Sequence, residues 1–291
     1  MLGGEPPLAA LYVVAFLVGA GEVLVDNAAQ ASVPHLAPVG PGGLDAANGR
    51  LLAAQTVTNN VIGAPLGAAA FAISMMLPFV FGALSLALCA VLLASLRTPL
   101  QTARTTSTTT GIWADVQDGM KALWTTPVLR RLALAGAGFN LCISGAYAVF
   151  VLLVVDVHGA TPLVYGLMLG VGAVGGLFGS LLAGRVTRAI GRRRTLILAT
   201  FAAAAGLLGM GLAPVLPLLA LMHLVTTTCL VVWSVISQSI RQAVTPDHLL
   251  GRVVASFRMI AFAGIPIGAG LVGAVATATS VRSAFCSLAS R

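Results

Sequence analysis

Long apolar runs separated by short polar stretches make up most of the chain. A run of about 20 apolar residues is long enough to cross a bilayer as a helix. Eight runs are close to this length or longer: 8–33, 51–77, 79–96, 132–155, 163–183, 195–212, 218–240 and 253–277. They are rich in Ala, Leu, Val and Gly and lack the alternation of barrel strands. The pattern therefore predicts an all-α membrane protein with about eight transmembrane helices.

The composition of the chain agrees with this prediction. Of the 291 residues, 58% are hydrophobic and only 8% are charged, whereas soluble domains are about 25% charged. The spacing of the four cysteines fits neither a disulfide framework nor a metal site; they are Cys89, Cys142, Cys229 and Cys286. We therefore expect no metal and no cofactor, and we interpret the cysteines as packing residues.

The basic residues lie mainly on one set of alternate loops. The formal net charge is +8. Threading eight helices alternately through the bilayer places most arginines on one side, and Glu5, Asp156 and His158 on the other. Because positive loops stay cytoplasmic, this charge predicts a multi-pass protein of the inner (plasma) membrane whose first helix starts outside. The charge then needs no nucleic-acid partner to explain it.

The longest polar stretch, 97–127, divides the chain. It begins as RTPLQTARTTSTTTG and continues as IWADVQDGMKALW. In the second part Ile112, Val116 and Met120 share one helical face, and two tryptophans suit a membrane interface. We expect an amphipathic helix on the cytoplasmic surface. The predicted regions are thus 1–98, the central loop 99–127, and 128–291.

The sequence contains two copies of one pattern. The matching positions are Asp45, Gly49, Arg50, Gly63, Pro65 and Gly67 in the first copy and Asp247, Gly251, Arg252, Gly264, Pro266 and Gly268 in the second. The offset is 202 residues for the first three pairs and 201 for the last three, and it spans six helices. Parallel repeats of this kind build two-half secondary transporters, so a complete molecule would hold about twelve helices. We expect this chain to hold numbers four to eleven and to be a truncated member or a fragment.

Several stretches resemble the major facilitator superfamily, within its drug-exporter branch of macrolide-efflux and enterobactin-exporter proteins. GEVLVDNAAQASVPHL is similar to the fourth helix of that branch, and LDAANGRLLAAQTVTNNVIGAPLG is similar to the fifth. GIWADVQDGMKALWTTPVLRRLAL resembles its central loop and seventh helix, and LLGRVVASFRMIAFAGIPIG resembles its eleventh. The resemblance implies a partial major facilitator fold of two parallel-repeat bundles. Helices four to six would lie in 1–98, and helices seven to eleven with a stub of the twelfth in 128–291.

The same resemblance implies a secondary active transporter that works by alternating access. It implies proton-coupled efflux of small amphiphilic molecules, such as drugs or siderophore-like compounds, without enzymatic activity. The partners would be a small-molecule substrate, protons and the lipid bilayer, with no nucleotide. The alternative is an inactive or structural membrane fragment of such a transporter.

Two carboxylates lie inside the first apolar run. Glu22, Asp26 and Gln30 share one helix face because they are spaced four residues apart. A charge within the bilayer costs about 3 kcal/mol on insertion scales, so each acid requires a function or a partner. Glu22 and Asp26 are therefore candidates for proton or cation coupling. Bonding to neighbouring helices is the alternative for Glu22, and for Asp26 we favour a structural or gating pair.

Three arginines are gating candidates. Arg258 lies about two turns inside the last run, where it would pair with Asp26, Glu22 or an acid outside this chain, or reach the surface. The loop GRVTRAIGRRR supplies the other two, Arg188 and Arg192. This loop resembles the family's loop motif, but Arg188 stands where the motif prefers an acid.

The resemblance places helices four, seven and ten around a central cavity. The substrate-cavity candidates are accordingly Gln30, Asn140, Tyr147 and Trp233, with bonding or packing between helices as the alternative. The repeated glycines and prolines are expected to allow bends and close helix packing; they are Gly63, Pro65, Gly67, Gly264, Pro266 and Gly268. Gly170, Gly172 and Gly175 spell GxGxxG, but they lie inside an apolar run without a preceding strand, so we expect no nucleotide site.

Overall fold

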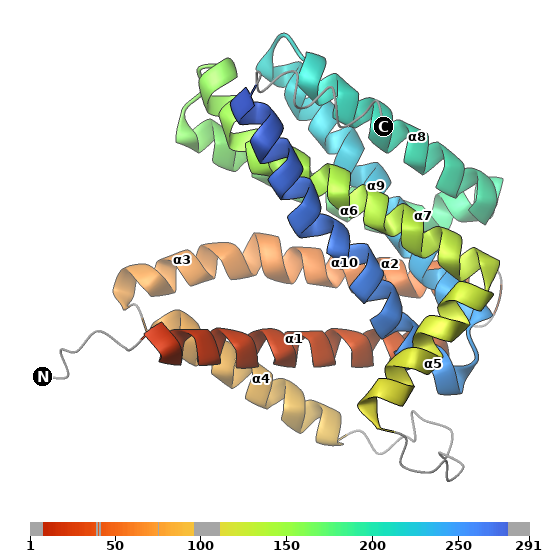
Figure 1. Cartoon of the computed structure of the whole chain (residues 1–291). Helices are drawn as coiled ribbons and strands as arrows, with labels where there is room; N and C mark the ends of the chain where they lie inside the picture. Colours follow the sequence, from red (N-terminus) through yellow and green to blue (C-terminus); the bar gives the residue numbers. More distant parts are fainter. Residues whose placement is uncertain (1–7, 39, 41, 75, 96–110, 279–291) are drawn as a thin grey trace, which may run out of the picture.

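The computed structural model describes residues 8–38, 40, 42–74, 76–95 and 111–278. Within these ranges every regular element is a helix (Figure 1). In chain order they are α1 (Leu8–Leu36), α2 (Gly43–Thr56), the π-helix η1 (Val57–Gly63), α3 (Ala64–Ile73), α4 (Leu77–Ser95), α5 (Ile112–Thr125), α6 (Pro127–Leu152), the π-helix η2 (Leu153–Val157), α7 (Pro162–Ile190), α8 (Arg192–Leu212), α9 (Leu216–Val244) and α10 (Asp247–Ala278). Most of the Thr-rich segment and the expected start of a twelfth helix lie outside the described residues.

Among the described residues, five helical segments are long and apolar enough to cross a membrane, judged by length and composition. They are Pro127–Val157, Leu163–Ile190, Arg192–Leu212, Leu216–Val244 and Asp247–Val272. The all-helical membrane architecture expected from the sequence is thereby confirmed, with one span for each of the last five apolar runs. Helices also cover most of the three N-terminal runs. That these helices cross the membrane stays a prediction.

Two helices begin well before the apolar runs that predict them. α2 begins at Gly43 rather than at 51, and α10 begins at Asp247 rather than at 253. Each carries an aspartate in its first turn, where the helix dipole stabilises a negative charge. Hydropathy marks only the apolar part of such a helix. Arg50 and Arg252 therefore belong to helices and not to loops.

The two repeat copies differ in backbone conformation. In the first copy the helix widens into the π-helix η1 just before Pro65, whereas α10 continues as an α-helix through Pro266. Pro65 has no backbone N–H to donate, and a π-turn is one way in which a helix passes such an interruption. The repeated sequence therefore predicted the helices but not this local widening.

Close backbone packing is present at the second copy of the glycine pattern. α10 lies along α6, and a Cβ atom added at Gly264 or Gly268 would overlap the carbonyl oxygen of Ala137 or Leu141, respectively. Around Gly67, by contrast, a Cβ atom would meet nothing within 4 Å. Close backbone packing of the repeated glycines is thus present on α10, whereas a side chain at Gly67 would meet open space.

The central helix α5 forms as the amphipathic pattern predicts. It lies against α10, and Arg252 binds its two aspartates, Asp115 at 2.6 Å and Asp118 at 3.1 Å. Leu123 is fully buried in the core, while Trp113 is 80% exposed. One face of α5 therefore packs on the helices of the second region, and Trp113 lies on the face that points away from them.

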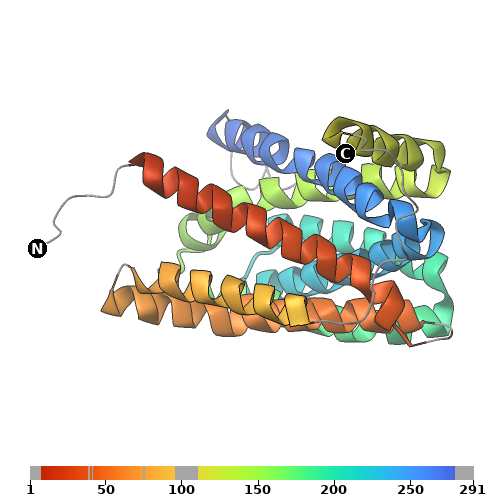
Figure 2. The same ribbon diagram turned by 90° about the horizontal axis from the view of Figure 1, so that it is seen from below.

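The helices form two groups, which we call the first bundle (α1 to α4) and the second bundle (α6 to α10). In both views the first bundle extends away from the second toward the left, and the two approach each other at the right (Figures 1 and 2). The approach is made by α2, which packs along α7, and by α1, which contacts α9 and α10. The ion-paired candidates Asp26, Arg192 and Arg258 lie at this end.

Candidate functional site

The two bundles are joined by a set of polar side chains that we call the inter-bundle polar interface. The first bundle contributes Asp26, Asn27, Asp45, Asn48 and Gln55, and the second contributes Arg192, Ser239, Gln242 and Arg258. The contacts between these groups lie toward the end of the molecule where α1 ends and α2 begins. The interface can therefore hold the bundles together at that end.

Small residues allow α2 and α7 to approach closely enough for these contacts. A Cβ atom at Gly49 would overlap the carbonyl oxygen of Ser180 on α7. One at Gly184 would lie 3.5 Å from the backbone of Ala46. Any side chain at Gly49 would therefore push the bundles apart.

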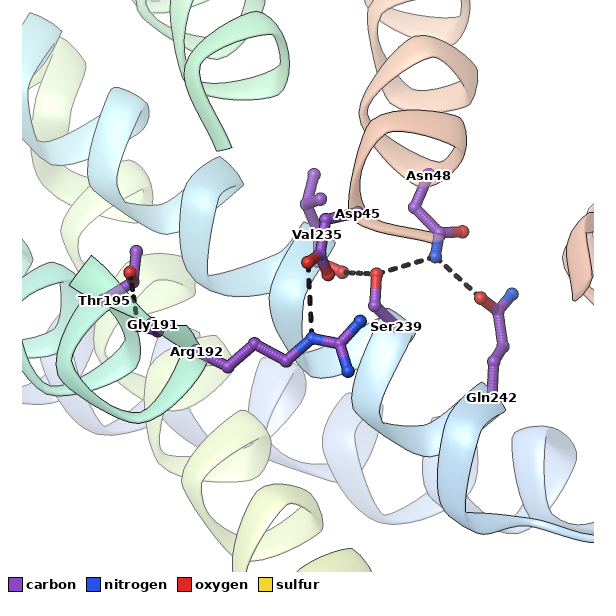
Figure 3. A network of polar contacts seen from close by, with 8 residues as sticks. All are labelled: Asp45, Asn48, Gly191, Arg192, Thr195, Val235, Ser239 and Gln242. Carbon is purple, nitrogen blue, oxygen red and sulfur yellow. Dashed lines mark hydrogen bonds and ion pairs between the residues drawn. The ribbon is translucent and has the colours of Figure 1, made fainter. Parts of the chain in front are cut away.

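Asn48 is a fully buried polar residue at the centre of the interface (Figure 3). Its amide Nδ2 donates to Ser239 Oγ at 2.9 Å and to Gln242 Oε1 at 2.6 Å. Gln242 in turn donates from Nε2 to the backbone oxygen of Gln30 on α1 at 2.7 Å. This chain of hydrogen bonds connects α1, α2 and α9. Because Asn48, Ser239 and Gln242 are all buried, water does not replace a bond that is lost.

Asp45 and Arg192 form an ion pair beside this network (Figure 3). Arg192 Nε lies 3.3 Å from Asp45 Oδ2, and Asp45 is completely buried while the Arg192 side chain is 35% exposed. The other carboxylate oxygen, Oδ1, has no hydrogen-bond partner among the described residues. The pair therefore links the start of α2 to the start of α8 with one buried and one accessible partner.

A second ion pair joins α1 to α10. Arg258 lies 3.3 Å from Asp26 Oδ2 and 3.2 Å from the side-chain oxygen of Asn27. Gln55 on α2 donates to the other oxygen of Asp26 at 3.1 Å, and Arg258 also lies 5.3 Å from the ring centre of Phe262. Of the partners expected for Arg258, the structure therefore brings Asp26 to it, and both groups are partly buried.

Glu22 lies one turn from Asp26 on α1 and is exposed. Among the described residues no hydrogen bond or ion pair to its carboxylate is present. Glu22 thus differs from Asp26, which two side chains hold in place. Of the two coupling candidates, Glu22 is exposed and unpaired, whereas Asp26 is ion-paired and only 28% exposed.

The substrate-cavity candidates fall into two classes. Asn140 donates to the backbone oxygen of Ala261 at 3.0 Å, and Trp233 is buried with its ring edge-on to Phe139 at 4.8 Å. The packing alternative therefore describes Asn140 and Trp233 in this conformation. Tyr147 is 39% exposed, and the Gln30 side chain is half-buried.

Arg188 lies beside the interface rather than within it. It is exposed, and its side chain makes no hydrogen bond or ion pair among the described residues. With Arg192 it lines a cavity of about 660 Å³ between the α1–α2 connection and the end of α7. In the part of the chain that the structure describes, no group of His, Cys, Asp or Glu residues is arranged to hold a metal.

Sequence reasoning did not identify Asn48 and Ser239 as interface residues. Both stand in helices rich in small or apolar residues, where a neutral polar residue is tolerated on any face. The available signal was spacing: Ser239 and Gln242 are three residues apart and so share a face of α9. Their partner Asn48 immediately precedes the close-contact residue Gly49.

Comparison with known proteins agrees with this architecture. The sequence profile of the Major Facilitator Superfamily matches residues 1–269. The multidrug efflux pump Tap of Mycolicibacterium fortuitum is 29% identical over 185 residues, which are 62% of this chain and 44% of the pump. The matched part therefore spans less than half of that relative.

A solved structure also resembles the chain in three dimensions. It is the crystal structure of a bacterial homologue of the iron transporter ferroportin in the outward-facing state. The TM-score is 0.64 at 17% sequence identity, and the match covers 86% of this chain and 62% of that chain. At this identity the likeness shows the fold alone.

Proposed function

The chain belongs to the major facilitator superfamily, and from this premise we propose a secondary active transporter that exports small amphiphilic molecules in exchange for protons. Transport of this type alternates between states in which the two bundles close one end or the other. Membership in a transporter family and the likeness to a multidrug efflux pump support this function.

The observation that carries the proposal is the one-sided contact between the bundles. Ion pairs and buried hydrogen bonds join them at one end, while the helices diverge toward the other (Figure 1). The joined end holds most of the arginines, and positive loops stay cytoplasmic. The conformation is then closed to the cytoplasm and open outward, and the ferroportin homologue was crystallised in an outward-facing state as well.

In this mechanism Glu22 and Asp26 couple proton entry to opening of the interface. A proton entering from outside first meets the exposed Glu22, and Asp26 lies one turn further in. When Asp26 takes up a proton, Arg258 loses its counter-charge and the α1–α10 contact weakens. The bundles then separate at the cytoplasmic end. A substrate that binds from the cytoplasm releases the proton and restores the pair.

Arg192 and Arg258 act as gating residues in this cycle because each pairs with an acid of the opposite bundle. Glu22, Tyr147 and Gln30 are the candidate residues that would contact a cationic amphiphile during transport. The site lies in the inner membrane, and the protein catalyses no chemical reaction. The alternative is a structural membrane protein that does not transport.

Ethidium accumulation in everted membrane vesicles with an acidic interior tests the proposal. We expect the wild type to accumulate ethidium, and Glu22→Gln to abolish accumulation because the substituted amide cannot exchange a proton. The matched control is Asp156→Asn, which removes an exposed acid from η2, far from the interface. Equal loss in both variants, or uptake that does not depend on the acidic interior, would refute proton coupling. No uptake by the wild type would favour the structural alternative.

A further inference from the structure

A cavity beside the Asp45–Arg192 pair has features that transport does not explain. It has a volume of about 660 Å³, and both bundles line it: Pro34, Leu44 and Asp45 from the first, and Thr187, Arg188 and Arg192 from the second. The alkyl part of Arg188 lies over Gly42, where a Cβ atom would be 3.1 Å from Arg188 Cγ. Gly42 has a φ of 79°, a left-handed conformation that glycine tolerates best.

Several polar groups lining this cavity have no partner among the described residues. Thr187 is 7% exposed, and its hydroxyl is buried without a hydrogen bond. Asp45 uses only one carboxylate oxygen. Arg192 bonds through Nε, which leaves its two terminal nitrogens as donors, and Arg188 forms no ion pair or hydrogen bond within the described ranges. Buried polar groups are normally satisfied, so the Thr187 hydroxyl, buried in the wall of the cavity, requires a partner that the described residues do not supply.

The charges of the cavity limit the ligand. Arg188 and Arg192 contribute two positive charges and Asp45 one negative charge, which leaves a net positive charge. A ligand with one negative charge neutralises this net charge. An anion with two or more negative charges would leave excess negative charge beside the Asp45 carboxylate, which would repel it. Guanidinium groups bind phosphate oxygens with particular affinity because of their planar donor geometry.

We propose that this cavity binds a phosphate group of single negative charge, either the phosphodiester of an anionic lipid headgroup or free phosphate. Arg188, the terminal nitrogens of Arg192 and the Thr187 hydroxyl donate to its oxygens. Basic pockets at the cytoplasmic ends of transmembrane helices are suitable sites for such headgroups. Pro34 and Leu44 add an apolar part to the lining, which suits the carbon atoms next to a lipid phosphate.

A bound phosphate would also hold the two bundles together. The walls of the cavity belong to the α1–α2 connection and to the α7–α8 turn, so separation of the bundles at this end would break up the site. The ligand therefore stabilises the closed interface, whether or not the protein exports drugs.

Thermal unfolding of the purified full chain tests the site with three probes: short-chain phosphatidylglycerol, short-chain diacylglycerol and inorganic phosphate. We expect phosphatidylglycerol to raise the unfolding midpoint saturably and diacylglycerol to leave it unchanged. If inorganic phosphate alone has the same effect as the lipid, the source is free phosphate. If none of the three probes gives a saturable rise, or if diacylglycerol acts as strongly as phosphatidylglycerol, the proposal is wrong.

Matched variants identify the residues involved. Arg188→Gln and Thr187→Val should each weaken binding by about tenfold or more, the effect of removing a hydrogen bond to a charged group. Arg193→Gln is the control, because it removes an equally exposed charge from the same turn without lining the cavity. Thr187→Ser keeps the hydroxyl and should retain affinity, which separates binding from folding defects. Equal weakening by Arg188→Gln and Arg193→Gln would show unspecific attraction and overturn the site.

Discussion

Removal of the Asn48 side chain should open the cytoplasmic end of the molecule. Asn48→Ala deletes both donations from Nδ2, at 2.9 Å to Ser239 Oγ and at 2.6 Å to Gln242 Oε1. Ser239 keeps its own bond to the backbone oxygen of Val235, so its loss is small. Gln242 Oε1 is left buried without a donor, which costs about 1–3 kcal/mol.

This cost raises the free energy of the closed state more than that of the open state. When the bundles separate, water reaches Gln242 and the penalty disappears. A central value of about 2 kcal/mol lowers the ratio of closed to open molecules about 30-fold, since each 1.4 kcal/mol is a factor of ten. Asn59→Ala is the matched control, because Asn59 is an exposed asparagine on the adjoining segment η1.

Spin labels on the two bundles would measure this shift. Arg50 on α2 and Arg193 on α8 are exposed, and cysteines at both positions can be labelled after replacement of the native ones. The distance distribution between the labels should gain a longer component in Asn48→Ala and stay unchanged in Asn59→Ala. If both variants give the wild-type distribution, the buried network does not hold the bundles together.

Three further predictions concern other contacts. Gly268→Leu should destabilise the protein by several kcal/mol because a Cβ there overlaps Leu141. Gly270→Leu is the control on the same helix, because a Cβ there meets open space. Equal unfolding midpoints of the two variants would contradict the α6–α10 packing. Arg258→Ala and Asp26→Ala should each strongly lower ethidium transport, and the double variant should be no worse than either single variant. Unchanged transport in Arg258→Ala would show that the Asp26–Arg258 pair is not a gate. Arg252→Ala should speed amide exchange in α5 but lower stability by only about 1 kcal/mol or less, since Asp118 is 53% exposed; unaltered exchange would show that packing alone holds α5.

The helices could be predicted from the sequence because they depend on local properties. A run of apolar residues forms a helix in lipid wherever it lies, and the amphipathic pattern of 112–125 likewise predicted α5. The distribution of arginines among the loops predicts the orientation by an equally local rule. The same hydropathy placed helix starts too late, at 51 and 253, because the polar first turns of α2 and α10 contribute no apolar signal.

The sequence predicted the surroundings of some candidate residues better than those of others. Of the three residues predicted to share one face of α1, Asp26 contacts the second bundle through its side chain, Gln30 does so through its backbone oxygen, and Glu22 is exposed. The repeat suggested equal packing for both glycine patterns, yet Gly67 lacks the close helix contact that Gly268 makes. Trp233, a cavity candidate with helix packing as the alternative, is buried in this conformation, as the packing alternative describes.

Pairing between distant helices was decided by packing alone. Asn48 meets Gln242 across a separation of 194 residues, and Asp45 meets Arg192 across 147. Helical periodicity shows which side chains share a face, but it does not show which face meets which helix. That choice depends on where backbones approach most closely, as Gly49 does at Ser180. Single polar residues in apolar helices became an interface only because this approach placed them within hydrogen-bonding distance.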